Sequence, residues 1–229
     1  MNVFQSCCVH CHTPLKLAKH GLCSRCNRTI RRFAYSSVAA ARNWRTNALH
    51  CGNCLRQEPA WDRMVIIGRY NEPLSTLIHR FKFQNQFWLD RTLARLLYLA
   101  IRDARRTHRL PLPEVILPVP LHHFRQWRRG YNQADLLAQQ LAKWFKIPVD
   151  NGLLLRTKRT PTQRGLTAKD RRHNLKNAFR ISTNDRHFPY RSVALVDDVI
   201  TTGSTLNEIA KRLRQANVVH IQVWGLART

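Results

Sequence analysis

The chain has 229 residues, enough for one ordinary domain and a small additional module. Hydrophobic residues make up 44% of it, which is enough for a packed core and argues against a globally disordered protein. The net charge of +26 is far beyond what solubility requires. It indicates an anionic partner, such as nucleic acid, a phosphorylated metabolite or an acidic membrane surface, with a generally basic solvated face as the alternative.

The N-terminal residues, MNVFQSCCVH, lack the charged segment and apolar run of a signal peptide. Residues 93–101 are the best candidate for a membrane span, but they are few and are interrupted by Arg95, so no span is predicted. We therefore expect a cytoplasmic protein. Seven cysteines in such a reducing compartment favour metal ligation over disulfides.

Two cysteine pairs near the N-terminus have the spacing of a zinc site. Cys8-x-x-Cys11 is followed after eleven residues by Cys23-x-x-Cys26, and four thiolates in two such pairs can enclose a tetrahedral Zn²⁺. The sequence therefore predicts a zinc-ribbon module in residues 1–60, where a structural metal replaces the core that so short a segment lacks. Buried free thiols are the alternative.

A third pair, Cys51 and Cys54, has no matching fourth pair. It could replace one of the earlier pairs as ligands, use another partner such as His50, or have lost the metal. Residues 25–32 are strongly basic. That charge suits contact with nucleic acid phosphates, although a zinc ribbon can equally be a platform for another protein.

Strand and helix patterns alternate after residue 60, which predicts a larger α/β domain with a parallel sheet over residues 61–229. The two helices expected at residues 74–83 and 88–106 are interpreted as a hood over the sheet. The expected strands cover residues 61–70, 115–120, 193–196 and 218–226. The expected helices cover residues 74–83, 88–106, 134–145 and a segment from residue 206 onward.

Basic residues gather between the strand expected at 115–120 and the next helix. A basic loop that enters a helix suits pyrophosphate or a nucleic acid backbone. Trp127 and Tyr131 are interleaved with these residues and could stack unpaired bases or anchor the loop on the core. The candidates for binding DNA or pyrophosphate are Arg125, Arg128, Arg129 and Tyr131.

Residues 153–179 are polar and strongly basic, with Pro161 and Gly165 as breakers. A long basic loop inside a compact domain is usually a lid or a binding loop. A disordered linker is the alternative, but apolar residues such as Phe179 offer docking points.

Residues 192–206, SVALVDDVITTGSTL, carry the most specific pattern. We expect a buried strand, an acidic turn at Asp197 and Asp198, a hydroxyl-rich loop and a helix. Backbone N–H groups at a helix N-terminus attract anions, and Gly203 lets the backbone come close to one. The carboxylates would accept hydrogen bonds from vicinal sugar hydroxyls or hold a hydrated Mg²⁺. A capped helix with acidic residues at its dipole is the alternative, but a cap needs one hydroxyl and not four.

This order of strand, acidic pair and TTGST loop closely resembles the phosphoribosyl-pyrophosphate (PRPP) signature of type I phosphoribosyltransferases. The resemblance implies that Asp197 and Asp198 contact the ribose 2′- and 3′-hydroxyls, while the loop holds the 5-phosphate. The loop residues to which this role carries over are Thr201, Thr202, Gly203, Ser204 and Thr205.

With the cysteine pairs, the RRGYNQADLLAQQLA stretch and the RTKRTPTQ…RRHNLKNAF segment, nearly the whole chain resembles the ComF/GntX family. The resemblance implies a type I phosphoribosyltransferase-like parallel sheet flanked by helices and, for the ComF branch, a role in DNA uptake during natural transformation. The PTQ…R…N pattern also resembles the amidophosphoribosyltransferase loop that closes over PRPP. The flexible-loop residues expected on that basis are Arg156, Thr162, Gln163, Arg171 and Arg172.

The chain also departs from these families. The ComF/GntX family often carries four cysteine pairs and this chain has three, so a second zinc does not follow. There is no glutaminase domain and no recognisable acceptor-base pocket, so the fold alone does not imply transferase activity.

Three functions remain open from the sequence. The prediction is a competence protein that handles incoming single-stranded DNA, with the phosphate loop gripping a DNA 5′-phosphate or binding PRPP as a regulatory ligand. The alternatives are an active phosphoribosyltransferase that uses PRPP and Mg²⁺ on an unknown acceptor, and an adaptor whose zinc ribbon docks a helicase or another DNA-processing protein of the uptake machinery.

Overall fold

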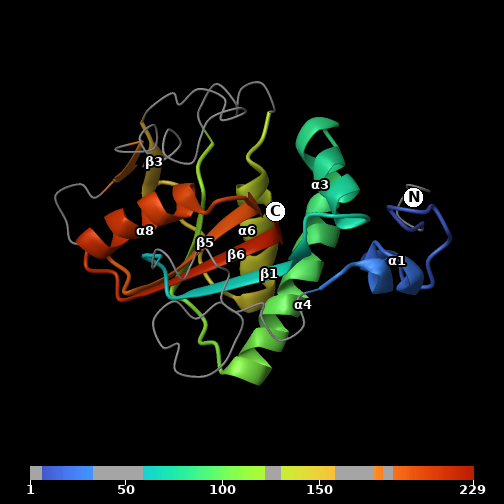
Figure 1. Ribbon diagram of the computed structural model, residues 1–229, viewed down its shortest axis with the longest axis horizontal. Helices are drawn as coiled ribbons and strands as arrows, with labels where there is room; N and C mark the ends of the chain where they lie inside the picture. The colour runs from blue at the N-terminus through green and yellow to red at the C-terminus, as the bar shows by residue number, and fades with distance from the viewer. Residues whose placement is uncertain (1–6, 33–58, 122–129, 158–177, 183–187) are drawn as a thin grey trace.

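The computed structural model describes residues 7–32, 59–121, 130–157, 178–182 and 188–229. Its main feature is a four-stranded sheet in which every neighbouring pair of strands is parallel, as the sequence predicts (Figure 1). In spatial order the strands are β1 (Arg63–Arg69), β6 (His220–Arg228), β5 (Ser192–Ile200) and β2 (Val115–Pro118).

Alternate residues of the inner strands point to opposite faces of the sheet, as the two-residue period of a strand requires. In β5, Ala194 and Val196 join one hydrophobic cluster, which we call the first core, while Val193 and Leu195 join a second cluster on the other face. Both faces are therefore buried. This explains why the strands consist of nearly continuous apolar runs instead of alternating polar and apolar residues.

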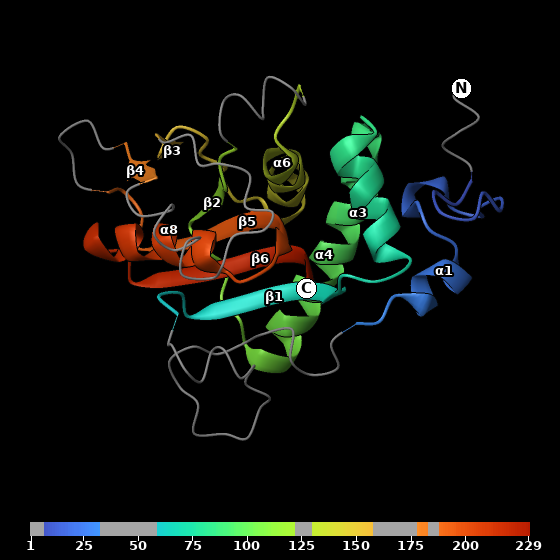
Figure 2. The same cartoon turned by 45° about the horizontal axis from the view of Figure 1, so that its top comes forward.

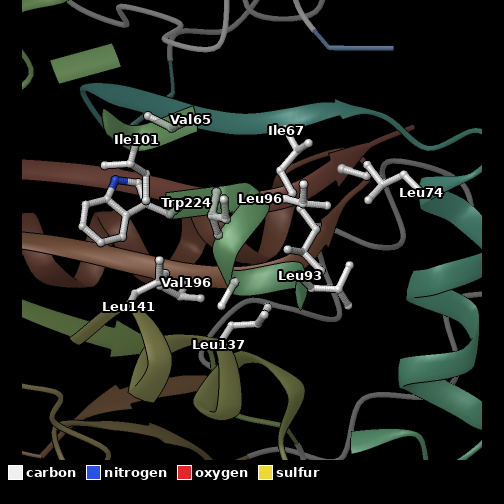
Figure 3. Close-up of a cluster of buried hydrophobic side chains, with 14 of the residues drawn as sticks. Val65, Ile67, Leu74, Leu93, Leu96, Ile101, Leu137, Leu141, Val196 and Trp224 are labelled. Carbon is white, nitrogen blue, oxygen red and sulfur yellow. The ribbon is translucent and has the colours of Figure 1, made fainter. Parts of the chain in front are cut away.

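Helices cover both faces. On one side α4 (Asp90–His108) lies against β1 and β6, and α6 (Gln133–Phe145) lies against β5 and β2. On the other side α8 (Ser204–Gln215) buries its apolar stripe, with Leu206 and Leu213 packed against the sheet. Figure 3 shows the first core, where Trp224 of β6 lies among side chains from α4, α6 and β5.

The helix α3 (Leu74–Phe83) and the short 3₁₀ helix η3 (Phe87–Leu89) precede α4. Both predicted helices exist, but α4 lies directly on the sheet and is not part of a hood. The reason is its apolar face, which buries Leu93 and Leu97 in the first core. The helix α3 packs on this layer through Leu77 and Phe81.

The N-terminal segment contains η2 (Ala18–His20) and α1 (Ser24–Thr29), which lie beyond α3 and α4 on the side away from α8 (Figures 1 and 2). It is closely packed on the larger domain. Gly21 lies against Thr92, where an added Cβ would meet the threonine hydroxyl at 2.0 Å. Arg32 forms an antiparallel bridge with Gly68 at the edge strand β1. Any boundary near residue 60 therefore separates two parts that share one hydrophobic cluster.

A second, antiparallel pair is formed by β3 (Leu154–Arg156) and β4 (Phe179–Ile181). The strand β4 lies next to α8. Within the described ranges, no helix has the length and hydropathy that crossing a membrane requires.

Candidate sugar-phosphate site and metal centre

The acidic pair lies inside β5, because the strand continues through Asp197 and Asp198 to Ile200. The sequence-based expectation of a turn at these residues is therefore wrong. The neighbouring strand β6 is long enough to pair with this extension, with Asp197 opposite Gly225 and Ile200 opposite Arg228. The consequence is that both carboxylates are held on a rigid inner strand close to its carboxyl end, where ligands of open parallel sheets bind.

Asp198 is buried and paired with a lysine from another element. The ammonium Nζ of Lys82, in α3, lies 2.9 Å from Asp198 Oδ1, and both side chains are mostly buried. The same carboxylate oxygen accepts a hydrogen bond from the Val199 N–H at 2.6 Å. The pair thus ties the outlying helix α3 to the acidic end of β5.

Asp197 has an unusual protonation equilibrium. Burial, followed by repulsion from the Asp198 carboxylate, raises the pKa of Asp197 to about 7, although Lys82 opposes the shift. Its Oδ1 accepts a hydrogen bond from the Asp198 N–H at 2.8 Å. Near neutral pH the site can therefore hold one proton, which a ligand that prefers two carboxylates would displace.

The hydroxyl-rich loop turns sharply between β5 and α8. Gly203 has φ +72° and sits at the N-cap of α8, in the left-handed region that favours glycine. A Cβ at this position would lie 2.9 Å from the Trp61 ring, so the turn leaves no room for a side chain. The turn and its packing on Trp61 therefore require a glycine here, while the approach of the Gly203 backbone to an anion stays a prediction.

The hydroxyls around this glycine gather at the helix start. Thr202 Oγ1 lies 2.8 Å from Ser204 Oγ and accepts a hydrogen bond from the Ser204 N–H at 3.3 Å. Thr201 and Thr202 are exposed, while Ser204 and Thr205 are half-buried. Exposed hydroxyls beside the positive end of a twelve-residue helix form an arrangement that can bind a phosphate group.

Two other candidate residues have identifiable places. The Tyr131 hydroxyl donates to the carbonyl oxygen of Phe81, and its ring centre lies 6.0 Å from that of Phe81 and 6.4 Å from that of Phe87. These contacts support the anchoring interpretation of Tyr131. The Arg156 guanidinium lies over the Phe179 ring at 5.4 Å, within the β3–β4 pair.

The remaining loop candidates lie outside the described residues. They are Arg125, Arg128, Arg129, Thr162, Gln163, Arg171 and Arg172.

Lys82 is a site residue that the sequence analysis missed. Its signal is positional: Lys82 comes four residues after the buried Ile78 and directly after the buried Phe81. A lysine at the edge of an apolar helix face has a partly buried ammonium that requires a partner. The identity of that partner, Asp198, depends on a contact between residues far apart in the sequence.

Four cysteines of the N-terminal segment converge, as their spacing predicts. The Sγ atoms of Cys8, Cys11, Cys23 and Cys26 all lie within 4.8 Å of one another. The Sγ atoms of Cys11 and Cys23 are 3.7 Å apart, which matches the ~3.8 Å edge of a tetrahedron with Zn–S bonds of about 2.3 Å. The donor set therefore fits a tetrahedral metal ion.

The surroundings act on two of the sulfurs in opposite directions, since burial raises the pKa of the Cys26 thiol well above its usual value. A hydrogen bond from the Thr13 side chain is the main cause that lowers the pKa of Cys11 to about 6. Cys23 precedes α1 and accepts a hydrogen bond from the Cys26 N–H at 3.4 Å. Cys7 is half-exposed and outside this group, while Cys51 and Cys54 lie outside the described residues.

A parallel α/β domain with an acidic pair and a hydroxyl-rich turn after an inner strand, joined to a four-cysteine module that could hold a metal ion, defines a phosphoribosyltransferase-like protein with a small N-terminal appendage. Competence protein F of Haemophilus influenzae is 66% identical over 228 residues, which cover 100% of this chain and 99% of that protein. The chain belongs to the competence protein F family.

Other relatives agree with this assignment. DNA utilization protein YhgH of Escherichia coli O157:H7 is 43% identical, with 97% of this chain and 96% of that protein covered. Competence protein ComFC of Streptococcus pneumoniae is 24% identical, with 90% and 87% covered. No protein-family model matches the chain.

A solved structure with a weaker likeness is a purine phosphoribosyltransferase from Pyrococcus horikoshii. It is 19% identical, with a TM-score of 0.36 over 59% of this chain and 73% of that one. The assignment of the fold therefore rests on the sheet topology and the motif, not on this superposition.

Proposed function

We propose that this protein acts in DNA uptake during natural transformation and handles incoming single-stranded DNA in the cytoplasm. The observation that carries the proposal is the 66% identity to a competence protein along the full chain, combined with a net charge of +26. Small-molecule transfer does not require such a charge, whereas a polyanion is held largely through neutralisation of its phosphates.

The four-cysteine module has a structural part in this proposal. Zn²⁺ is the metal that suits four thiolates in tetrahedral geometry, and a closed site of this kind leaves no open position for chemistry. Bound there, zinc would hold Val9 and the following residues against α3, where the Arg80 guanidinium donates to the Val9 carbonyl at 2.6 Å. Other proteins of the uptake machinery, such as a helicase, are candidate partners for this module.

The site at the end of β5 would bind a sugar phosphate, either PRPP or a DNA 5′-phosphate. The hydroxyls of Thr202 and Ser204 and the start of α8 suit the phosphate, while the Asp197 and Asp198 carboxylates suit vicinal hydroxyls or a hydrated Mg²⁺. A DNA 5′-nucleotide lacks the 2′-hydroxyl, so the acidic pair suits PRPP better.

The test of DNA handling is equilibrium binding of a fluorescent single-stranded oligonucleotide at several salt concentrations. We expect the logarithm of the binding constant to fall linearly with the logarithm of the salt concentration, because the protein displaces counterions from the DNA phosphates that it binds. A protein that binds the strand with no salt dependence, or does not bind it at all, would contradict the proposal.

A second candidate function is an active phosphoribosyltransferase, favoured by the acidic pair on the inner strand next to the hydroxyl loop. Displacement at C1 would pass through an oxocarbenium-like state, with the leaving pyrophosphate stabilised by cations. Thermal unfolding with PRPP and Mg²⁺ tests occupancy of the site, since a ligand at 100 times its Kd adds about 2.7 kcal/mol. A missing shift would exclude both the enzyme and a regulatory PRPP site.

A further inference from the structure

Three large aromatic rings stand exposed within six residues of the chain. Phe83 closes α3, and Phe87 and Trp88 belong to η3; their exposed fractions are 56%, 57% and 55%. We call Phe83, Phe87 and Trp88 the aromatic ledge. Rings of this size are usually buried because their burial stabilises a protein, so their exposure together points to a ligand.

The ledge is held in a defined arrangement. The rings of Phe87 and Trp88 meet edge to face, with centres 5.7 Å apart at 75°. Phe87 also meets Tyr131 edge to face, and Tyr131 is itself anchored on Phe81. The faces of Phe87 and Trp88 are thus oriented by contacts with other rings.

The turn that carries the ledge is fixed by hydrogen bonds. The Arg80 Nε donates to Gln86 Oε1 at 2.8 Å, and the Gln84 N–H donates to the Arg80 carbonyl at 3.1 Å. Leu89, the last residue of η3, is fully buried and anchors the turn on the core. Because the backbone is already ordered, a ligand that stacks here has little ordering entropy to overcome.

One residue of the ledge is linked through the chain to the sugar-phosphate site. Phe83 directly follows Lys82, whose ammonium reaches Asp198 at the end of β5. One short helix end therefore carries an exposed ring and a contact to the acidic pair. A ligand with both phosphates and planar groups could use the two places together.

The charges around the ledge favour an anionic ligand. Residues 79–91 contain the cations Arg80, Lys82 and Arg91, of which Lys82 is paired with Asp198, and their single carboxylate is Asp90. That carboxylate is engaged, since its oxygens accept hydrogen bonds from the Arg91 N–H and from Gln140 Nε2. Planar groups attached to an anionic chain describe the bases of a single nucleic acid strand better than an apolar peptide.

We propose that the aromatic ledge is a stacking platform for the unpaired bases of single-stranded DNA. The inference rests on the proposed role in DNA handling and specifies its binding surface. Exposed aromatic rings in a positively charged setting bind single strands with little dependence on sequence, because every base has a π face. The ligand is therefore a strand of any sequence, recognised by its unpaired bases.

Arg80 also connects the ledge to the metal module. The same side chain that holds Gln86 donates from a terminal nitrogen to the carbonyl of Val9, the residue after Cys8. Loss of the metal would release this carbonyl and loosen the turn. The metal would thus support base stacking without touching the DNA.

The experiment compares two fluorescent probes, an oligothymidylate of about 12 nucleotides and an abasic strand of the same length. We expect Phe87→Ala and Trp88→Ala to weaken binding of oligothymidylate by roughly 5- to 150-fold and to leave abasic binding unchanged. Trp88→Phe keeps a ring and should retain most of the affinity. Leu99→Ala, an exposed apolar residue on α4 away from the ledge, is the control and should bind like the unmodified protein.

The slope of affinity against salt should be the same in all of these variants, because no phosphate contact is removed. Arg80→Met should weaken oligothymidylate binding while its zinc content stays unchanged. All these substitutions are compared at equal folded fraction, measured by thermal unfolding.

Several results would overturn the inference. If Phe87→Ala and Trp88→Ala bind oligothymidylate as the unmodified protein does, the ledge does not stack bases, although DNA handling stands. The ledge also does not stack bases if the variants lose the same affinity for both probes. The same conclusion follows if the unmodified protein binds the abasic strand as tightly as oligothymidylate. A protein partner that needs the ledge while these variants keep full DNA affinity would make it a protein-docking surface. If the unmodified protein binds neither probe, the proposed function fails as well.

Discussion

Lys82 Nζ lies 2.9 Å from Asp198 Oδ1. Its positive charge partly compensates the two adjacent carboxylates of Asp197 and Asp198 on β5. The pair joins residues 116 positions apart, and their side chains are 18% and 11% exposed. It links the helix that carries Phe83 of the aromatic ledge to the strand that carries the acidic pair.

Lys82→Met should destabilise the protein by about 2–3 kcal/mol at pH 8, because it leaves a mostly buried charge without its partner. The loss should shrink toward pH 5, where protonation of Asp197 reduces the repulsion between the carboxylates. Urea unfolding at the two pH values measures both effects. Lys211→Met, on the exposed side of α8, is the matched control and should change little. Equal stability of Lys82→Met and the control would contradict this account of the pair.

Asp197→Asn should make the protein more stable at pH 8, by on the order of 2–4 kcal/mol. Burial and Asp198 raise the pKa of Asp197 to about 7, so the folded state binds a proton more readily than the unfolded state between about pH 4 and pH 7. The stability contributed by this proton falls as pH rises through that window. The amide has no proton to lose and can still accept the hydrogen bond from the Asp198 N–H.

The measurement for Asp197→Asn is the free energy of unfolding as a function of pH. The difference from the unmodified protein should be largest above pH 7 and should nearly vanish at pH 4. A variant that is less stable at pH 8, or whose advantage grows toward acid, would show that Asp197 is ionised with a low pKa.

Gly203→Ala should cost about 2–4 kcal/mol and abolish phosphate binding, because it adds a strained left-handed residue and a Cβ contact of 2.9 Å with Trp61. Gly130→Ala separates these two effects. Gly130 also has a positive φ, of +78°, but no heavy atom within 4 Å of an added Cβ, so it should cost only about 1 kcal/mol. Thermal unfolding of both variants checks that Gly203→Ala destabilises the protein more than Gly130→Ala does. Equal losses of stability would mean that the Trp61 contact is unimportant.

Cys8→Ser should reduce the zinc content from one ion per chain to none, because Cys8 contributes a buried sulfur to the four-cysteine group. Residues 7–32 should then lose protection from hydrogen exchange, because a metal held by the four cysteines would tie this segment together. Cys7→Ser, one position earlier but outside the group, should keep the full zinc content. Metal analysis of the purified variants decides the point, and loss of zinc in Cys7→Ser would contradict the ligand set.

Much of the fold follows from sequence patterns. The helix at 74–83 has the predicted bounds, and the strands lie where continuous apolar runs occur, because burial on both faces gives a clear local signal. The cysteine cluster is equally local, since two short C-x-x-C pairs determine the donor set. The expectation of a turn at Asp197 and Asp198 is wrong because the end of β5 depends on how far β6 continues beside it.

The parts that sequence could not supply are contacts between distant segments. Lys82 near Asp198 and Arg80 near Val9 both need the packing of α3 to be known. The aromatic ledge illustrates the same limit. A ring in an amphipathic helix is usually buried, and only the exposure of Phe83 in the folded chain distinguishes it from a core residue.

The transformation frequency of a Haemophilus influenzae strain that lacks its competence protein F tests the central claim most directly. The unmodified chain should restore transformation, since the two proteins are 66% identical along their full length. Asp197→Asn should restore at least about tenfold less at equal abundance, because it stays folded but lacks one of the two carboxylates that would bind the sugar. Failure of the unmodified chain, present at normal abundance, to restore transformation would contradict a role in DNA uptake.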